Sequence, residues 1–111
     1  MALTGKQTQH LRSLAHGLKP VVQVGTKGIS EALIQQVSEQ LAAHELIKIR
    51  FNTDSIEPGE VADELALRTR SELVQKLGRM LILYRRHDDK PKIELPSAKR
   101  LRASSRGTGA P

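Results

Sequence analysis

The chain has 111 residues, no cysteine, no tryptophan and a formal net charge of +6. This length suits one domain with a single core, and the lack of cysteine excludes disulfide scaffolds, Cys-ligated zinc sites and thiol catalysis. No apolar stretch has the length of a membrane span or of a signal-peptide core, so we expect a cytoplasmic protein with no membrane partner.

Apolar periodicity in the first half of the chain predicts two helices, each followed by a strand. Thr4 and Gln7 have the spacing of a capping box, and Pro20 prevents the first helix from continuing. Alternation marks the second strand and puts Lys48 and Arg50 on its polar side. The predicted ranges are a helix over 5–16, a strand over 21–24, a helix over 30–43 and a strand over 46–51.

A third helix and a hairpin follow. Pro58 suits the first turn of the helix, and Gly78-Arg79 between two apolar runs predicts a tight type II′ turn. Strands are predicted over 72–77 and 80–84, with a short edge segment over 92–95. This order predicts an α/β fold, a compact α-β-α-β-α-β-β sandwich with a mixed four-stranded sheet. Residues 1–96 form this domain, and we expect 97–111 to be a disordered basic tail.

Charges of opposite sign are segregated along the chain. Residues 1–28 contain no acid, the region 51–75 is acidic, and residues 76–111 are basic again. Such segregation predicts one basic and one acidic face, and a basic face favours a polyanionic partner. Ordinary solvated surface is an equally typical explanation of a charge run. The cations of the first helix and the segment after it are Lys6, Arg12 and Lys19.

The segment Gly25-Thr26-Lys27-Gly28 lies between a predicted strand and a predicted helix start. Glycines leave backbone amides accessible, the helix presents free N–H groups at the same point, and Lys27 adds a full charge. Such a Gly-x-x-Gly loop can clamp a nucleic-acid backbone. A plain β-turn with two left-handed glycines is the alternative.

No motif for catalysis or cofactor binding stands out. The chain has neither a Walker A sequence nor a dinucleotide-binding fingerprint, and its four histidines lack metal-ligand spacing. Asp88-Asp89 follows the last predicted strand, where solvated charge is the ordinary interpretation. We therefore expect a protein that is not an enzyme and has no cofactor or metal.

Two motifs together resemble a known family. The chain reads Ala-His-x-Leu-Lys-Pro over 15–20 and Gly-x-x-Gly over 25–28, and the pattern continues into the hairpin over 78–85. On these motifs residues 3–96 resemble the bacterial YhbY-type single CRM domain (chloroplast RNA splicing and ribosome maturation). The chain departs from the family at Arg70, where related sequences often carry glycine after the third helix, which leaves the end of that helix open.

This resemblance implies a fold similar to the C-terminal domain of translation initiation factor three. It also implies RNA binding, with pre-rRNA of the large ribosomal subunit as the partner of an assembly factor; we expect a monomer. With one Phe and one Tyr, recognition should use backbone and shape rather than base stacking. The alternatives are a non-catalytic adaptor for a ribosomal or other protein and, with little support, a duplex-DNA binder. The implied RNA-binding residues are Gly25, Thr26, Lys27 and Gly28 in the loop and Lys6, Arg12 and Lys19 on the basic surface.

Overall fold

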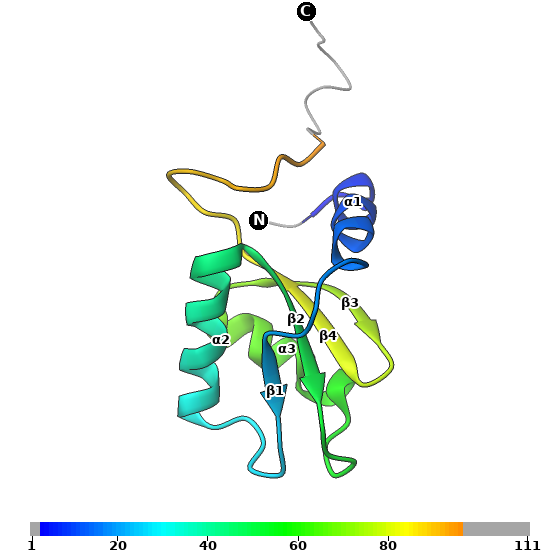
Figure 1. Cartoon of the computed structure of the whole chain (residues 1–111), viewed down its shortest axis with the longest axis vertical. Coiled ribbons are helices and arrows are strands. Elements are labelled where there is room, and N and C mark those ends of the chain that lie inside the picture. Colours follow the sequence, from blue (N-terminus) through cyan, green and yellow to red (C-terminus); the bar gives the residue numbers. More distant parts are fainter. Residues whose placement is uncertain (1–2, 97–111) are drawn as a thin grey trace, which may run out of the picture.

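Helices and strands alternate along the chain in the predicted order (Figure 1). The computed structural model describes residues 3–96, and the predicted tail over 97–111 lies outside them. Within the described range, no helix is long and apolar enough to cross a membrane. The elements are α1 (Gly5–Ala15), β1 (Val22–Val24), α2 (Glu31–His44), β2 (Leu46–Phe51), α3 (Pro58–Thr69), β3 (Glu72–Leu77) and β4 (Met80–Tyr84).

The strands form one mixed sheet in the order β1-β2-β4-β3, which confirms the predicted fold class. β1 runs parallel to β2, with Gln23 in register with Arg50, because α2 provides the crossover between them. β2 and β4 are antiparallel, as are β3 and β4. The hairpin turns at Gly78, where φ is +60°, whereas Arg79 has no positive φ. This combination is the pattern of the predicted type II′ turn.

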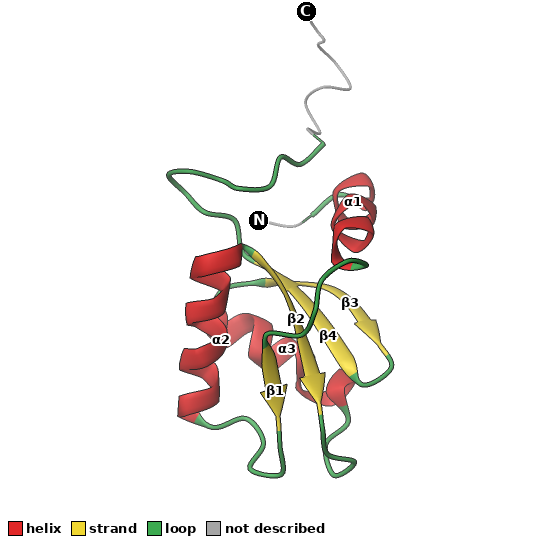
Figure 2. Ribbon diagram, in the orientation of Figure 1, coloured by secondary structure: helices red, strands yellow, loops and turns green. Residues whose placement is uncertain are grey.

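Helices lie on both faces of the sheet, as Figure 2 shows. α2 and α3 pack on one face through the larger apolar cluster, to which Val37, Ile49 and Leu65 belong. α1 packs on the other face through a smaller cluster that includes Leu11 and Tyr84. We call this second side of the sheet the α1 face. Because α1 sits over one end of it (Figure 1), no helix of the described residues covers the remainder of the α1 face.

The helix boundaries follow local hydrogen bonding. The predicted capping box is present: the Gln7 amide donates to Thr4 Oγ1 at 3.1 Å, and the Thr4 amide donates to Gln7 Oε1 at 3.0 Å. α3 ends at Thr69, and Arg70 takes the left-handed conformation with φ +56°. Glycine adopts this conformation without strain, which accounts for the glycine often found here in the family that the chain resembles.

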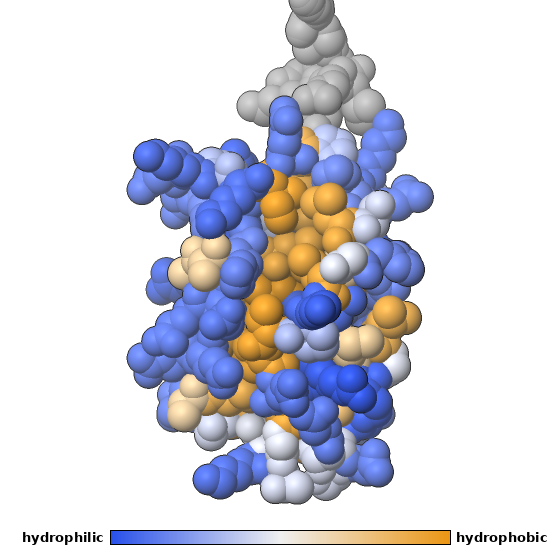
Figure 3. Space-filling view, viewed as in Figure 1, coloured by the Kyte–Doolittle hydropathy of each residue, from blue (hydrophilic) through white to orange (hydrophobic). Residues whose placement is uncertain are grey.

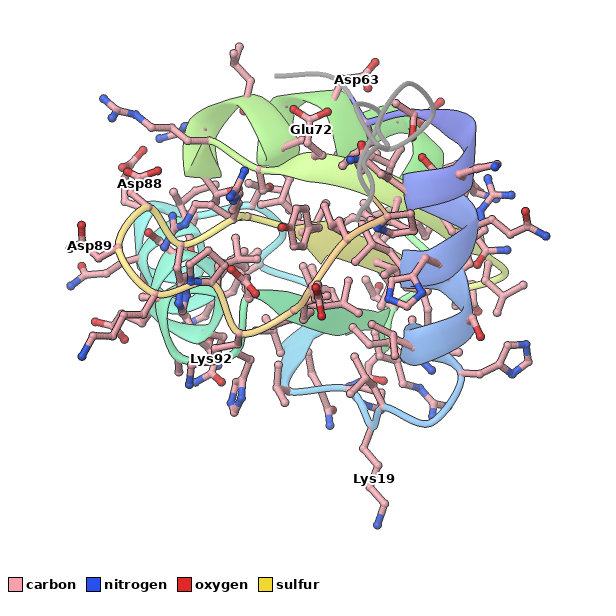
Figure 4. The ribbon with its side chains drawn as sticks, turned by 90° about the horizontal axis from the view of Figure 1, so that it is seen from above. Lys19, Asp63, Glu72, Asp88, Asp89 and Lys92 are labelled. Atoms are coloured by element: carbon pink, nitrogen blue, oxygen red, sulfur yellow. The ribbon has the colours of Figure 1, made fainter. Side chains whose placement is uncertain are left out.

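Residues 85–96 form a strap across the end of the sheet, which we call the C-terminal strap (Figure 4). The carboxylate of Glu45 is fully buried and accepts hydrogen bonds from the amides of His87, Lys92 and Ile93 at 2.7–2.9 Å. The prediction of an edge segment over 92–95 is therefore wrong. Two of the amides that an edge pairing would use are bound to this carboxylate instead.

Candidate nucleic-acid interface

The Gly-x-x-Gly loop joins β1 to α2 at the lower end of the sheet in Figure 1. The amide of Gly28 donates to the carbonyl oxygen of Gly25 at 3.1 Å, which closes a β-turn. Gly25, Thr26 and Lys27 are exposed, and no acceptor among the described residues faces the amides of Thr26 and Lys27. These two donors and the Lys27 ammonium are thus available to an anion.

The two glycines of the loop have different structural roles. Gly28 has φ +73°, and a Cβ built on it would lie 3.3 Å from Cδ1 of Ile56. Gly25 has no positive φ, and a Cβ built there would meet no atom within 4 Å. The alternative in which both glycines serve a left-handed turn is therefore wrong, because only Gly28 is required by the backbone. The bare Cα of Gly25 faces open space.

The start of α2 offers less to an anion than expected. Ser30 Oγ accepts a hydrogen bond from the amide of Leu33 at 3.1 Å, so one of the free N–H groups is already satisfied. Glu31 stands in the first turn and pairs with Arg68. The prediction that this helix start presents free N–H groups is therefore wrong for the amide of Leu33, and the two exposed amides of the loop are donors that remain for an anion.

The predicted basic residues do not form one patch with the loop. Lys6 and Arg12 belong to α1, which lies over the end of the sheet away from the loop (Figure 1). Arg12 Nε donates to the carbonyl oxygen of Val74 on β3 at 3.4 Å. Lys19, in contrast, lies in the linker between α1 and β1, three residues before the strand that leads into the loop.

Two cations of β2 complete this arrangement, and sequence reasoning did not assign them to the site. Arg50 is in register with Gln23 of β1, and Lys48 is opposite Ile82, a member of the α1-face cluster. Both side chains therefore lie on the α1 face. Lys48 is only 8 % exposed, so most of its side chain is covered. A lysine can bury its aliphatic stem in this way and keep its ammonium at the surface.

Strand pairing sets the order of these charges along the sheet. The amide of Val21 donates to the carbonyl oxygen of Lys48 at 3.0 Å. Lys48 is therefore level with Val21, which follows Lys19 by two residues. The Gln23–Arg50 pair follows, and then the loop with Lys27. The alternation over 46–51 indicates that Lys48 and Arg50 share one side of the strand. Only the parallel pairing of β1 with β2 shows that this side lies next to Lys19 and the loop. We name this series the basic strip: Lys19, Lys48, Arg50 and Lys27.

The charges of the basic strip are not neutralised within the described part of the chain, whereas several other cations are. No ion pair there involves a strip residue, but Arg68 pairs with Glu31 and Glu64, and Lys76 pairs with Glu57. The pKa of Glu57 is lowered, mainly by a hydrogen bond from the Gly59 amide and next by the hydrogen bond from Lys76.

Acids of α3 and β3 lie on the side of the molecule opposite Lys19. In Figure 4, Lys19 extends from one side and Asp63 of α3 and Glu72 of β3 lie on the opposite side. Glu57, Glu60 and Glu64 also belong to the start or body of α3. The predicted segregation into a basic and an acidic face therefore holds for these described residues. Between residues 3 and 96, no group of three His, Cys, Asp or Glu is placed to hold a metal ion.

Known proteins share this chain's sequence over most of its length. The CRS1/YhbY (CRM) domain family matches residues 3–85. The chain belongs to this family. The probable RNA-binding protein YqeI of Bacillus subtilis is 43% identical over 95 residues, covering 85% of this chain and 99% of that protein. An RNA-binding protein of Haemophilus influenzae is 36% identical over 95 residues, covering 85% and 95%.

A solved structure agrees with the fold of this CRM-domain chain. The solution structure of the hypothetical protein SAV1595 from Staphylococcus aureus superposes with a TM-score of 0.73 at 44% identity. The match covers 86% of this chain and 100% of that one. The resemblance identified from the two sequence motifs is thereby confirmed.

Proposed function

We propose that this CRM-domain protein binds RNA, without catalysing a reaction, and holds the sugar–phosphate backbone with the Gly-x-x-Gly loop and the basic strip. The names of its relatives, which describe RNA-binding proteins, support this assignment. The observation that carries it is the alignment of an exposed loop with cations that have no acidic partner among residues 3–96. Two of these cations, Lys48 and Arg50, lie on the sheet face opposite α3 and its acids.

The loop contacts a phosphate through the amides of Thr26 and Lys27, and the missing side chain of Gly25 allows a close approach. The strip then follows the strand direction. Lys48 and Arg50 are two residues apart on β2, about 6.6 Å along the strand, which is similar to the separation of successive phosphates in an RNA strand. Binding of this kind depends on charge and shape more than on base identity.

The RNA partner in this proposal is pre-rRNA, and the protein acts as an assembly factor of the large ribosomal subunit. It acts in the cytoplasm and as a monomer. Support for this finer assignment comes from the YhbY-type resemblance of the two motifs at 15–20 and 25–28.

The test compares two charge reversals in titrations against transcribed large-subunit rRNA. Lys27→Glu should weaken binding and make the dependence of log K on log salt shallower by about 1 or more, because at least one phosphate contact is lost. Lys90→Glu is the matched control, since Lys90 is an exposed lysine of the C-terminal strap and the change in net charge is the same. Circular dichroism confirms that both variants are folded.

Equal affinity of the two variants would contradict the role of the loop. Co-sedimentation with ribosomal particles separates RNA binding from the adaptor alternative. RNase treatment of the particles should release the protein; retention after complete RNA digestion would favour docking to a protein.

A further inference from the structure

An apolar hollow of about 430 Å³ lies beside the basic strip, where α1, the end of α2 and the start of β2 meet. Its lining includes both Leu46 of the α1-face cluster and Ile47 of the larger cluster. Its aliphatic walls come from separate parts of the fold: Leu14 from α1, Leu18 and Val21 from the linker to β1, and Leu46 from β2. Ile93 of the C-terminal strap closes another side. Figure 3, in the view of Figure 1 with α2 on one side and α1 on the other, shows apolar side chains gathered in the middle and polar residues around them.

The hollow is open to solvent. Leu14 is 41 % exposed and Val21 is 39 % exposed, although most large apolar residues of the chain are in the two clusters. Hollows of this size lie in the range of small-ligand sites. An occupant that covered Leu14 and Val21 would remove apolar surface from water, which is favourable.

The rim of the hollow is basic. Lys19 and His44 are the two polar side chains among its lining residues, and no carboxylate lines it. Lys19 is also the first residue of the basic strip, and Val21 is hydrogen-bonded to the backbone of Lys48. An occupant with an apolar body and anionic flanks fits both features. A nucleotide in an RNA strand has this combination, because its base is largely apolar on both faces and a phosphate stands on either side.

We infer that the hollow receives the base of an unpaired nucleotide while Lys19 and His44 hold its flanking phosphates. This inference rests on the proposed RNA binding and adds a place where a base, rather than the backbone alone, contacts the protein. The walls carry no hydrogen-bonding side chain apart from the two at the rim. The hollow therefore selects an extruded base by its size and apolar faces, with little discrimination among the bases.

The test uses an RNA hairpin whose stem carries one unpaired adenosine and the same hairpin with an abasic residue at that position. The ratio of the two affinities isolates the base, because the phosphates are identical. We expect the protein to bind the adenosine hairpin roughly fivefold more tightly, the low end of what a base contact contributes. Val21→Glu, which places a carboxylate at the hollow, should reduce this ratio to one. Leu14→Ser, which leaves the charge unchanged, should also lower it.

Leu67→Glu is the matched control. Leu67 lies on α3, is 79 % exposed and is not a lining residue, so this variant has the same charge change as Val21→Glu and should keep the ratio. A ratio of one in the unmodified protein, with salt-dependent binding of both hairpins, would overturn the inference and leave RNA binding intact. An apolar protein segment would then be the occupant to consider. Failure to bind either hairpin or rRNA would instead refute the proposed function.

Discussion

Gly25 and Gly28 occupy equivalent places in the Gly-x-x-Gly motif but meet different physical demands. Only Gly28 has a positive φ and a close neighbour, Ile56. Gly28→Ala should lower the free energy of unfolding by about 1–2 kcal/mol, the cost of left-handed backbone for a residue with a Cβ. Gly25→Ala should leave stability unchanged and weaken RNA binding, because the new methyl group occupies the open space above the backbone. Urea unfolding and rRNA titration measure the two effects.

The pair of variants separates a structural from a binding role at the same loop. If Gly25→Ala binds RNA as well as the unmodified protein, phosphate does not approach the backbone at Gly25. If Gly25→Ala is destabilised as much as Gly28→Ala, the conformation described for the turn is incorrect.

A single buried carboxylate explains the path of the chain after β4. Glu45 has φ +70°, an unfavourable conformation for a residue with a side chain, and is nevertheless fully buried. The three hydrogen bonds that its carboxyl oxygens accept from amides of the C-terminal strap offset the cost of burial and of the unfavourable φ. The strap in turn brings Ile93 to the apolar hollow, so this residue also shapes a candidate binding surface.

At the scale of elements, the end of α3 carries backbone strain. Arg70 is exposed, has φ +56°, and its amide is bonded to the last turn of the helix. Arg70→Gly should raise the free energy of unfolding by about 0.5–1 kcal/mol, because relief of the left-handed strain exceeds the added entropy of the unfolded chain. Thermal and urea unfolding provide the measurement.

Arg70→Ala is the control for the change at the end of α3. It removes the same guanidinium but keeps a Cβ, so it should not stabilise the protein. Equal stabilisation by alanine and glycine would mean that side-chain charge, rather than backbone conformation, is responsible.

At the scale of the whole molecule, charge separation across the sheet determines how RNA binding responds to salt. The basic strip has four cations, Lys19, Lys27, Lys48 and Arg50. Lys48 and Arg50 lie on the sheet face opposite α3, and Lys19 extends from the side opposite Asp63 of α3. If each neutralises one phosphate, log K for rRNA should fall with log salt at a slope between about −2.8 and −3.6. Titrations at several salt concentrations measure this slope. A slope near zero would contradict an electrostatic interface.

Much of the fold could be predicted because its signals are local. The capping box at Thr4, the stop at Pro20 and the turn at Gly78 each involve residues within a few positions of one another. The predicted strands agree closely with the observed ones for the same reason. The sequence did not predict where α3 ends, because Arg70 takes the left-handed conformation there and a non-glycine residue gives no sequence signal for it.

The candidate site was only partly predictable because its parts are distant in sequence. The motif at 25–28 and the cation Lys19 were identified directly, but Lys48 and Arg50 were noted only as the polar side of a strand. Their place between Lys19 and the loop depends on the register of β1 with β2. The sequence likewise grouped Lys6 and Arg12 with the loop, whereas α1 lies at the other end of the sheet.

The order of the elements, the family and the Gly-x-x-Gly loop follow from the amino-acid sequence alone, since periodicity, turn chemistry and motif spacing are properties of neighbouring residues. The folded chain was needed to show which glycine the turn requires, that Lys48 and Arg50 lie on the α1 face, and that Glu45 holds the strap beside an apolar hollow. These features depend on contacts between residues many positions apart, and strand pairing and burial, not local preference, bring such residues together.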